Sequence, residues 1–442
     1  MSSKGIALWI AAVVLAVAAV PSRAIVPIQH WQTASGARVY FVENRGLPML
    51  DISVEFPAGA GFDRTELAGV ASMTNRLLRT GADGMNEDEI ARRIADIGAQ
   101  LDSRFDTDRA GLALRTLSGA RERRQALDVF ARVLRAPAFS QEVLEREKVR
   151  LVGALKESDT RPDTIASRIF YRLVYRDHPY ALRASGEVET VEGFTREDLI
   201  GFYRSHYAAQ HAVVAIIGDV SRAEAEAIAE QVTRGLPQAS GAAPSLAPVT
   251  ALAASATRVV AHPASQSHIL IGAPGMRRDD PDYVALFVGN YVLGGGGLVS
   301  RITEEVRNKR GLAYSAYSYF SPLQREGPFV IGLQTQREQA PVALKVVDEV
   351  LREFLARGPT PEELVNAKKN IIGGFPLRID TNRKIQGYLA LIGYYRLPLT
   401  YIEDFVRNVE RVSTADIMDA FKRRIDPDRM VTVVVGAGAE KK

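Results

Sequence analysis

Apolar residues in the first half of the chain follow two spacings, and their order predicts a mixed α+β fold. Residues 38–42 and 51–56 alternate between apolar and polar positions, as strands do, and Gly46 lies in a turn between them. We expect these strands to pair as a hairpin. Later segments with strand-like alternation are 99–105 and 110–117, and segments with helical spacing are 66–79, 87–97, 121–135, 141–158 and 163–175.

An internal repeat predicts two homologous halves. Residues 195–203 form a helix start of capping-box type and lead to the apolar run 212–218, which ends on Gly. Residues 413–421 and 430–436 repeat this order 218 positions later. Each copy is therefore expected to close one half with a buried strand.

The remainder of the second half also reads as α+β. Expected strands are 257–261, 267–272 and 327–335, and expected helices are 281–293, 341–356, 361–373 and 381–394. Ala, Pro, Ser and Gly dominate residues 239–256, which predicts a linker. We therefore expect domains at 25–238 and 257–442, each an antiparallel-rich sheet with packed helices.

The N-terminus is typical of a secretory signal. Lys4 precedes an apolar run from Ile6 to Val20, and small residues at Ser22 and Ala24 predict cleavage after Ala24. The alternative is a retained anchor, although the run is shorter than the roughly 20 residues of a spanning helix. The chain has no cysteine, which suits an oxidising compartment. A periplasmic protein with no stable membrane insertion after cleavage is expected.

Charge argues against nucleic acid as a partner. The 56 basic and 52 acidic residues give a net charge of +4, and removal of residues 1–24 deletes Lys4 and Arg23 and no acid. The remaining +2 is too small for a basic stripe that binds phosphates.

The most informative stretch is residues 294–320, which reads as loop, helix, turn and strand. Gly294, Gly295, Gly296 and Gly297 permit close approach of other backbone, and Ser300 stands at a helix N-cap position. Gly311 predicts the helix end, and the aromatic run 314–320 predicts a strand. The glycine run is not a phosphate loop, because no Lys-Ser/Thr follows it.

This stretch resembles the second-domain signature of the pitrilysin/insulinase zinc peptidases, the inverzincins. The similarity lies in Leu-Val-Ser-Arg-Ile at 298–302 and Val-Arg-Asn-Lys-Arg-Gly-Leu-Ala-Tyr-Ser at 306–315, and it extends over nearly the whole mature chain. The resemblance implies two similar domains that face each other as a half-clamshell. It also implies that Arg307 and Tyr314 contact a peptide substrate near the scissile bond, with the glycine run beside them.

The zinc-binding motif of this family is missing. The family uses His-x-x-Glu-His on a helix and a distant Glu, but the matching positions here are Ser72, Asn75 and Arg76. Residues 149–156 offer no acid for the third ligand, and the six histidines are scattered. We therefore expect this chain to bind no metal or other cofactor. A Ser nucleophile is not indicated either, because Gly-x-Ser-x-Gly and Ser-x-x-Lys are absent.

A retained Arg-Tyr pair beside a lost zinc helix suggests division of labour between subunits. The resemblance implies that this chain is the non-zinc subunit of the bacterial two-subunit branch, with zinc held by a homologous partner that carries His-x-x-Glu-His. A peptide is expected to add as a strand to a sheet edge. One alternative is an inactive homologue that serves as a peptide-binding or assembly module, and another is an enzyme with an unrecognised metal site.

Overall fold

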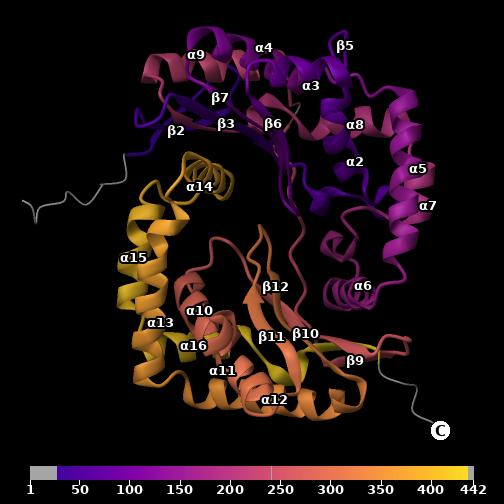
Figure 1. Cartoon of the computed structure of the whole chain (residues 1–442), viewed down its shortest axis with the longest axis vertical. Coiled ribbons are helices and arrows are strands. Elements are labelled where there is room, and N and C mark those ends of the chain that lie inside the picture. The colour runs from indigo at the N-terminus through magenta and orange to yellow at the C-terminus, as the bar shows by residue number, and fades with distance from the viewer. Residues whose placement is uncertain (1–26, 240, 437–442) are drawn as a thin grey trace, which may run out of the picture.

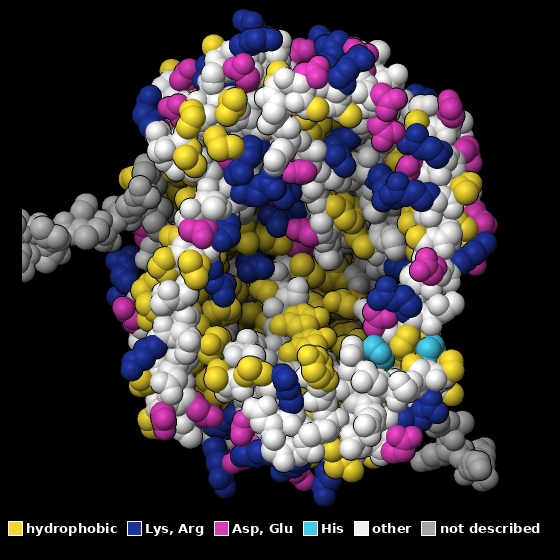
Figure 2. All heavy atoms as spheres, viewed as in Figure 1, with side chains coloured by type: hydrophobic (Ala, Val, Ile, Leu, Met, Phe, Trp, Pro, Cys, Tyr) yellow, Lys and Arg dark blue, Asp and Glu magenta, His cyan; other side chains and the backbone are white. Residues whose placement is uncertain are grey.

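The chain folds into two α+β halves that face each other (Figure 1), and the space-filling view shows a central hollow between them (Figure 2). The computed structural model describes residues 27–239 and 241–436. The predicted signal segment 1–24 and its cleavage point lie outside the described residues. Among the described helices, none is long and apolar enough to cross a membrane.

The first half contains a six-stranded mixed sheet in the order β1-β2-β8-β3-β7-β6. Its strands are β1 (Gln29–Gln32), β2 (Arg38–Glu43), β3 (Met49–Phe56), β6 (Gln100–Phe105), β7 (Ala110–Leu117) and β8 (Val213–Gly218). The predicted hairpin of residues 38–56 is wrong. Strand β8 lies between β2 and β3, parallel to the former and antiparallel to the latter. All six residues of β8 are buried, so this apolar strand lies inside the sheet, between the two strands that were expected to pair with each other.

The second half contains a five-stranded sheet in the order β11-β12-β10-β13-β9. Its strands are β9 (Ala256–Val260), β10 (Gln266–Met276), β11 (Ala313–Phe320), β12 (Gly327–Gln336) and β13 (Val431–Val435). Strand β13 is parallel to β9 and antiparallel to β10, which repeats the position of β8 in the first sheet. The predicted repeat is thus confirmed, and β6 and β11 are equivalent edge strands of the two halves.

The helices surround the two sheets. Those of the first half are α2 (Val70–Leu77), α3 (Glu87–Ala95), α4 (Ala120–Arg135), α5 (Gln141–Ser158), α6 (Pro162–Tyr175), α7 (Val188–Gly193), α8 (Arg196–His206) and α9 (Arg222–Thr233). Those of the second half are α10 (Tyr283–Asn290), α11 (Arg301–Thr303), α12 (Ala340–Arg357), α13 (Pro361–Gly374), α14 (Asn382–Tyr395), α15 (Tyr401–Arg411) and α16 (Thr414–Arg424). Sequence reasoning missed α7, α9 and α15. The predicted capping boxes at the starts of α8 and α16 are present.

Each half of the chain supplies one helix that covers the sheet of the other half. Helix α6 packs on β10 and β13 of the second sheet, and α14 packs on β8, β3 and β2 of the first (Figure 1). Both contacts are close: a Cβ on Gly393 of α14 would lie 2.5 Å from Val213, and one on Gly272 of β10 would lie 3.0 Å from Phe170 of α6. A single apolar cluster, which includes Phe170 and Val213, therefore extends across both halves.

Residues 239–256 carry no helix or strand in their described part before β9 begins at Ala256, but they are not free of the body of the protein. Leu246 and Leu252 are buried in the shared apolar cluster, and Arg325 donates from Nε to the Leu246 carbonyl at 2.7 Å. The linker is therefore fastened at two leucines rather than exposed throughout.

Candidate functional site

Helix α2 carries the three positions at which the family signature would place metal chemistry. Asn75 is buried, and its side-chain nitrogen donates to the Gly111 carbonyl of β7 at 2.9 Å and toward the Tyr207 hydroxyl at 3.4 Å. Ser72 is half-buried. Asn75 thus has a structural role, because it satisfies a backbone acceptor between helix and sheet.

Arg76 forms an ion pair with a buried carboxylate. Its Nη1 lies 3.3 Å from Oε2 of Glu147 on α5, and Arg146 and Arg150 approach the same carboxylate at 3.4 and 3.9 Å. Sequence reasoning missed Glu147, because this residue precedes the inspected segment 149–156. Its distance of 71 positions from Arg76 was the available signal, since the family motif includes a distant Glu. Guanidinium groups neutralise this carboxylate, and their positive charge would repel a cation.

The residues of this helix do not fit zinc. Across residues 27–239 and 241–436, no three His, Cys, Asp or Glu side chains are grouped so that they could hold a metal ion. Four of the six histidines place a ring nitrogen at a backbone carbonyl instead. His206 Nδ1, for example, lies 2.9 Å from the Pro57 carbonyl and His178 Nε2 lies 3.0 Å from the Ala247 carbonyl. No metal-dependent step is therefore assigned to this chain.

The N-terminus of α2 is held by Asp63. Its two carboxylate oxygens accept hydrogen bonds from the backbone N–H groups of Gly69, at 2.8 Å, and Ala71, at 2.9 Å. Burial raises the pKa of Asp63 to about 7, although the two hydrogen bonds oppose this shift. The orientation of α2 therefore depends on a buried acid that titrates near neutrality.

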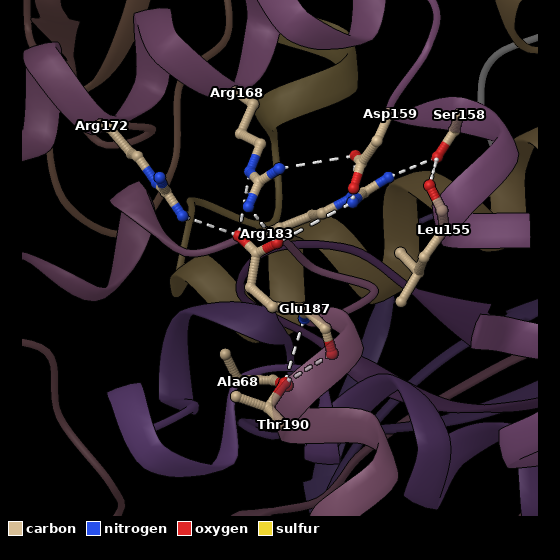
Figure 3. Close-up of polar contacts among 9 residues, drawn as sticks. All are labelled: Ala68, Leu155, Ser158, Asp159, Arg168, Arg172, Arg183, Glu187 and Thr190. Atoms are coloured by element: carbon tan, nitrogen blue, oxygen red, sulfur yellow. Dashed lines mark hydrogen bonds and ion pairs between the residues drawn. The ribbon is translucent and has the colours of Figure 1, made fainter.

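An ion network joins this region to α6 (Figure 3). Glu187 pairs with Arg168 at 2.5 Å and Arg172 at 2.9 Å, both from α6. Thr190 of the following helix donates to the carbonyl of Ala68, next to the N-cap of α2, at 2.8 Å. The network therefore connects the helix that covers the second sheet with the backbone that leads into α2.

Arg307 and Tyr314 lie together at the start of edge strand β11. The Arg307 guanidinium carbon stands 5.2 Å from the Tyr314 ring centroid, a cation–π arrangement. The pairing of β11 with β12 shifts register between Ala313 and Ser315, so Tyr314 occupies a β-bulge, and its side chain is 80% exposed. Among the described residues, no carboxylate lies within ion-pair distance of Arg307. The donors of both side chains are therefore available.

The turn between these two residues has the expected form. Gly311 adopts a left-handed φ of +62°. Its N–H donates to the Arg307 carbonyl, and the N–H of Leu312 donates to the Val306 carbonyl, both at 2.9 Å. This helix termination directs the chain from Arg307 back into β11.

The glycine run at 294–297 packs against β11 through Gly294. A Cβ on Gly294 would lie 2.3 Å from the Ser318 hydroxyl, so Gly294 is a buried packing position that cannot touch a peptide. Gly295 and Gly297 are exposed, and Gly297 has a φ of +64°. Only the outer part of the run therefore remains available as a binding surface.

The two equivalent edge strands differ in how open they are. On β6, Arg79 donates to the Leu101 carbonyl at 2.9 Å and to the Ser103 hydroxyl at 3.1 Å, which occupies part of that edge. On β11, Tyr317 and Tyr319 are partly exposed and stacked, with ring centroids 6.0 Å apart. The space-filling view shows apolar side chains along the floor of the hollow and Lys and Arg side chains above them (Figure 2).

A buried acid joins the two halves beside these strands. Asp108, in the loop between β6 and β7, accepts hydrogen bonds from the hydroxyls of Tyr180 and Tyr395 and from the backbone N–H of Gln324, each at 2.7 Å. Tyr394 also donates to its backbone carbonyl at 2.9 Å. Burial raises the pKa of Asp108, opposed by the tyrosine hydrogen bonds. We refer to these five residues as the Asp108 junction.

Fold and site together define a two-domain α+β protein in which, among the described residues, helix α2 takes part in no metal-binding group. The chain belongs to the peptidase M16 (insulinase) family. Residues 38–186 match the family description "Insulinase (Peptidase family M16)", and residues 193–371 match "Peptidase M16 inactive domain". The family expected from the sequence is thereby confirmed.

Individual relatives agree with this assignment. The chain is similar to the peptidase M16 inactive domain structure from Pseudomonas fluorescens, with 38% identity, a TM-score of 0.90 and coverage of 94% of this chain and 99% of that one. It is 25% identical to "Non-peptidase homolog YmxG" of Helicobacter pylori over 90% of this chain and 91% of that protein. A protease structure from Helicobacter pylori shares the fold, with a TM-score of 0.86, 18% identity and coverage of 93% of this chain and 100% of that one.

Proposed function

We propose that this chain is the non-zinc subunit of a two-subunit periplasmic metalloendopeptidase that degrades or processes peptides. The observation that carries the proposal is the pairing of Arg307 with Tyr314, since the phenol lies at a bulge and is exposed, and the guanidinium forms no ion pair with any of the described residues. A homologous subunit with His-x-x-Glu-His would supply zinc.

The chemistry assigned to this chain is hydrogen-bond donation. The Arg307 guanidinium and the Tyr314 hydroxyl can donate to a substrate carbonyl oxygen as it gains negative charge. Each preorganised donor of this kind is worth about 3 kcal/mol in the transition state. Strand β11 is an edge on which an extended peptide can form main-chain hydrogen bonds, which favours selection by length and extension over sequence.

The second candidate is an inactive homologue that binds peptides or serves in assembly. The Helicobacter pylori relative named a non-peptidase homologue favours it. The two candidates differ in one requirement, because an inactive module does not need the donors of Arg307 and Tyr314.

The test uses the mature chain reconstituted with a zinc-binding homologous subunit. Arg307→Ala and Tyr314→Phe should each lower kcat for peptide hydrolysis about 100-fold or more, with a smaller effect on KM and unchanged association. Arg310→Ala is a matched control, because Arg310 lies on the same turn and pairs with Glu305. Full activity of a pair that carries both substitutions would favour the inactive module.

A further inference from the structure

A pocket in the second half lies apart from Arg307 and Tyr314. It has a volume of about 330 Å³ and lies between α10, α14, α15 and the turn Phe375–Arg378 that follows α13. This volume is near the lower end of small-ligand pockets. The segment before α10 adds Arg278 to its walls.

Positive charge predominates in this pocket. Arg278, Arg378 and Lys384 line it, and none of the described residues that line it is Asp or Glu. Lys384 is paired, since its Nζ lies 2.8 Å from Asp380. The two arginines form no ion pair with any carboxylate of the described residues.

Arg278 is held by aromatic rings rather than by acids. Its guanidinium carbon lies 5.6 Å from the ring centroids of both Tyr283 and Tyr395. Its Nε is buried, and no hydrogen-bond partner for it exists among the described residues. Tyr395 also belongs to the Asp108 junction, so the ring that supports Arg278 is itself fixed by a hydrogen bond to Asp108. A cation oriented in this way is preorganised for an anion.

The rest of the lining indicates which chemical group is attached to the anion. Phe375, Ile402 and Phe405 provide an apolar surface, and the hydroxyl-bearing residues Tyr388 and Tyr401 lie beside it. A guanidinium matches the two oxygens of a carboxylate, whereas the apolar surface would be left in water by a small inorganic anion. The lining therefore suits a carboxylate attached to an apolar or aromatic group.

We propose that this pocket binds the C-terminal carboxylate of a peptide that ends in an apolar or aromatic residue. This proposal rests on the proposed function, because peptides are the substrates assigned to the protein. Arg278 and Arg378 bind the carboxylate, and the Phe375 and Phe405 rings pack against the terminal side chain. The pocket selects peptides by their free end, in addition to the backbone contacts along β11.

The first experiment tests the pocket with a small probe. Binding of N-acetylphenylalanine and of its uncharged amide to the mature full-length chain is measured by calorimetry. The acid should bind at least tenfold more tightly than the amide, and Arg278→Gln and Arg378→Gln should each remove most of that preference. Arg357→Gln is the matched control, because Arg357 is an exposed residue of α12 that does not line the pocket. Equal binding of acid and amide, or an unchanged affinity in Arg278→Gln, would overturn the proposal.

A second variant fills the pocket without removing charge. Gly387 lines the pocket from α14, and a Cβ there would meet no atom within 4 Å, so Gly387→Leu should fold normally and abolish binding of the acid. Retained binding would contradict the assigned position.

A peptide pair then tests the biological ligand. Two peptides of identical sequence that end in Phe, one with a free C-terminus and one amidated, are bound to the reconstituted pair of subunits. The free form should bind at least tenfold more tightly. If the small acid binds but the two peptides bind equally, the pocket takes a free carboxylic acid and the peptide proposal is wrong. If the acid binds and neither peptide does, the proposed peptidase function fails while the carboxylate pocket stands.

Discussion

Substitution of Asp108 should loosen the contact between the two halves. The Asp108 side chain accepts three hydrogen bonds of 2.7 Å, from Tyr180, Tyr395 and Gln324. These donors come from the first half, from α14 and from the loop between β11 and β12. Asp108→Ala leaves all three donors without their acceptor in a buried region.

The magnitude follows from these three bonds. Each buried donor left unpaired costs about 1 to 3 kcal/mol, and removal of a buried carboxylate recovers part of that cost. We expect Asp108→Ala to lower the free energy of unfolding by about 3 to 5 kcal/mol. Asp428→Ala is a suitable control, because Asp428 forms an exposed pair with Arg352 and should have little effect.

Urea denaturation followed by circular dichroism measures this change. A cycle with Tyr395→Phe identifies its origin, because both substitutions remove the same hydrogen bond and their effects should be less than additive. A change within about 0.5 kcal/mol of wild type, or strictly additive effects, would refute the assignment of Asp108 as a junction between the halves.

Two further predictions concern helix α2. Metal analysis of the dialysed mature chain should find no stoichiometric zinc, because Arg76 and Asn75 are committed to Glu147 and Gly111; one tightly bound zinc per chain would contradict the division of labour. The pKa of Asp63 is raised from 3.8 to about 7 in the folded protein, so the folded state prefers the protonated carboxyl group. The stabilisation that results is complete below about pH 4 and is lost as pH rises through 7. The stability of wild type relative to Asp63→Asn should therefore fall by up to about 4 kcal/mol between pH 4 and 8, measured by urea denaturation; parallel pH profiles would exclude this titration.

Helices α6 and α14 hold the two halves together, because each packs on the sheet of the other half. Because each helix covers the sheet of the other half, the halves cannot separate without exposing Phe170 and the surface around Gly393. The edge strands β6 and β11 are thus held in a defined relation by the protein's own core.

Local patterns in the sequence determined much of the fold. Periodicity located most helices and strands, because burial of one face imposes a spacing that is visible without the structure. The repeat of residues 195–218 at 413–436 identified two halves, and Gly311 marked the turn that brings Arg307 close to Tyr314. The absence of His-x-x-Glu-His at Ser72, Asn75 and Arg76 was likewise readable from the chain alone.

Tertiary structure decided everything that depended on partners distant in sequence. Strand β8 lies between β2 and β3, and α6 and α14 pack on the sheets of the opposite halves. Burial of apolar surface is favourable whichever segment of the chain supplies that surface. The pairing of Arg76 with Glu147 and the assembly of the Asp108 junction arose in the same way. These contacts join residues that are far apart in the sequence, so they leave no periodic signal in it.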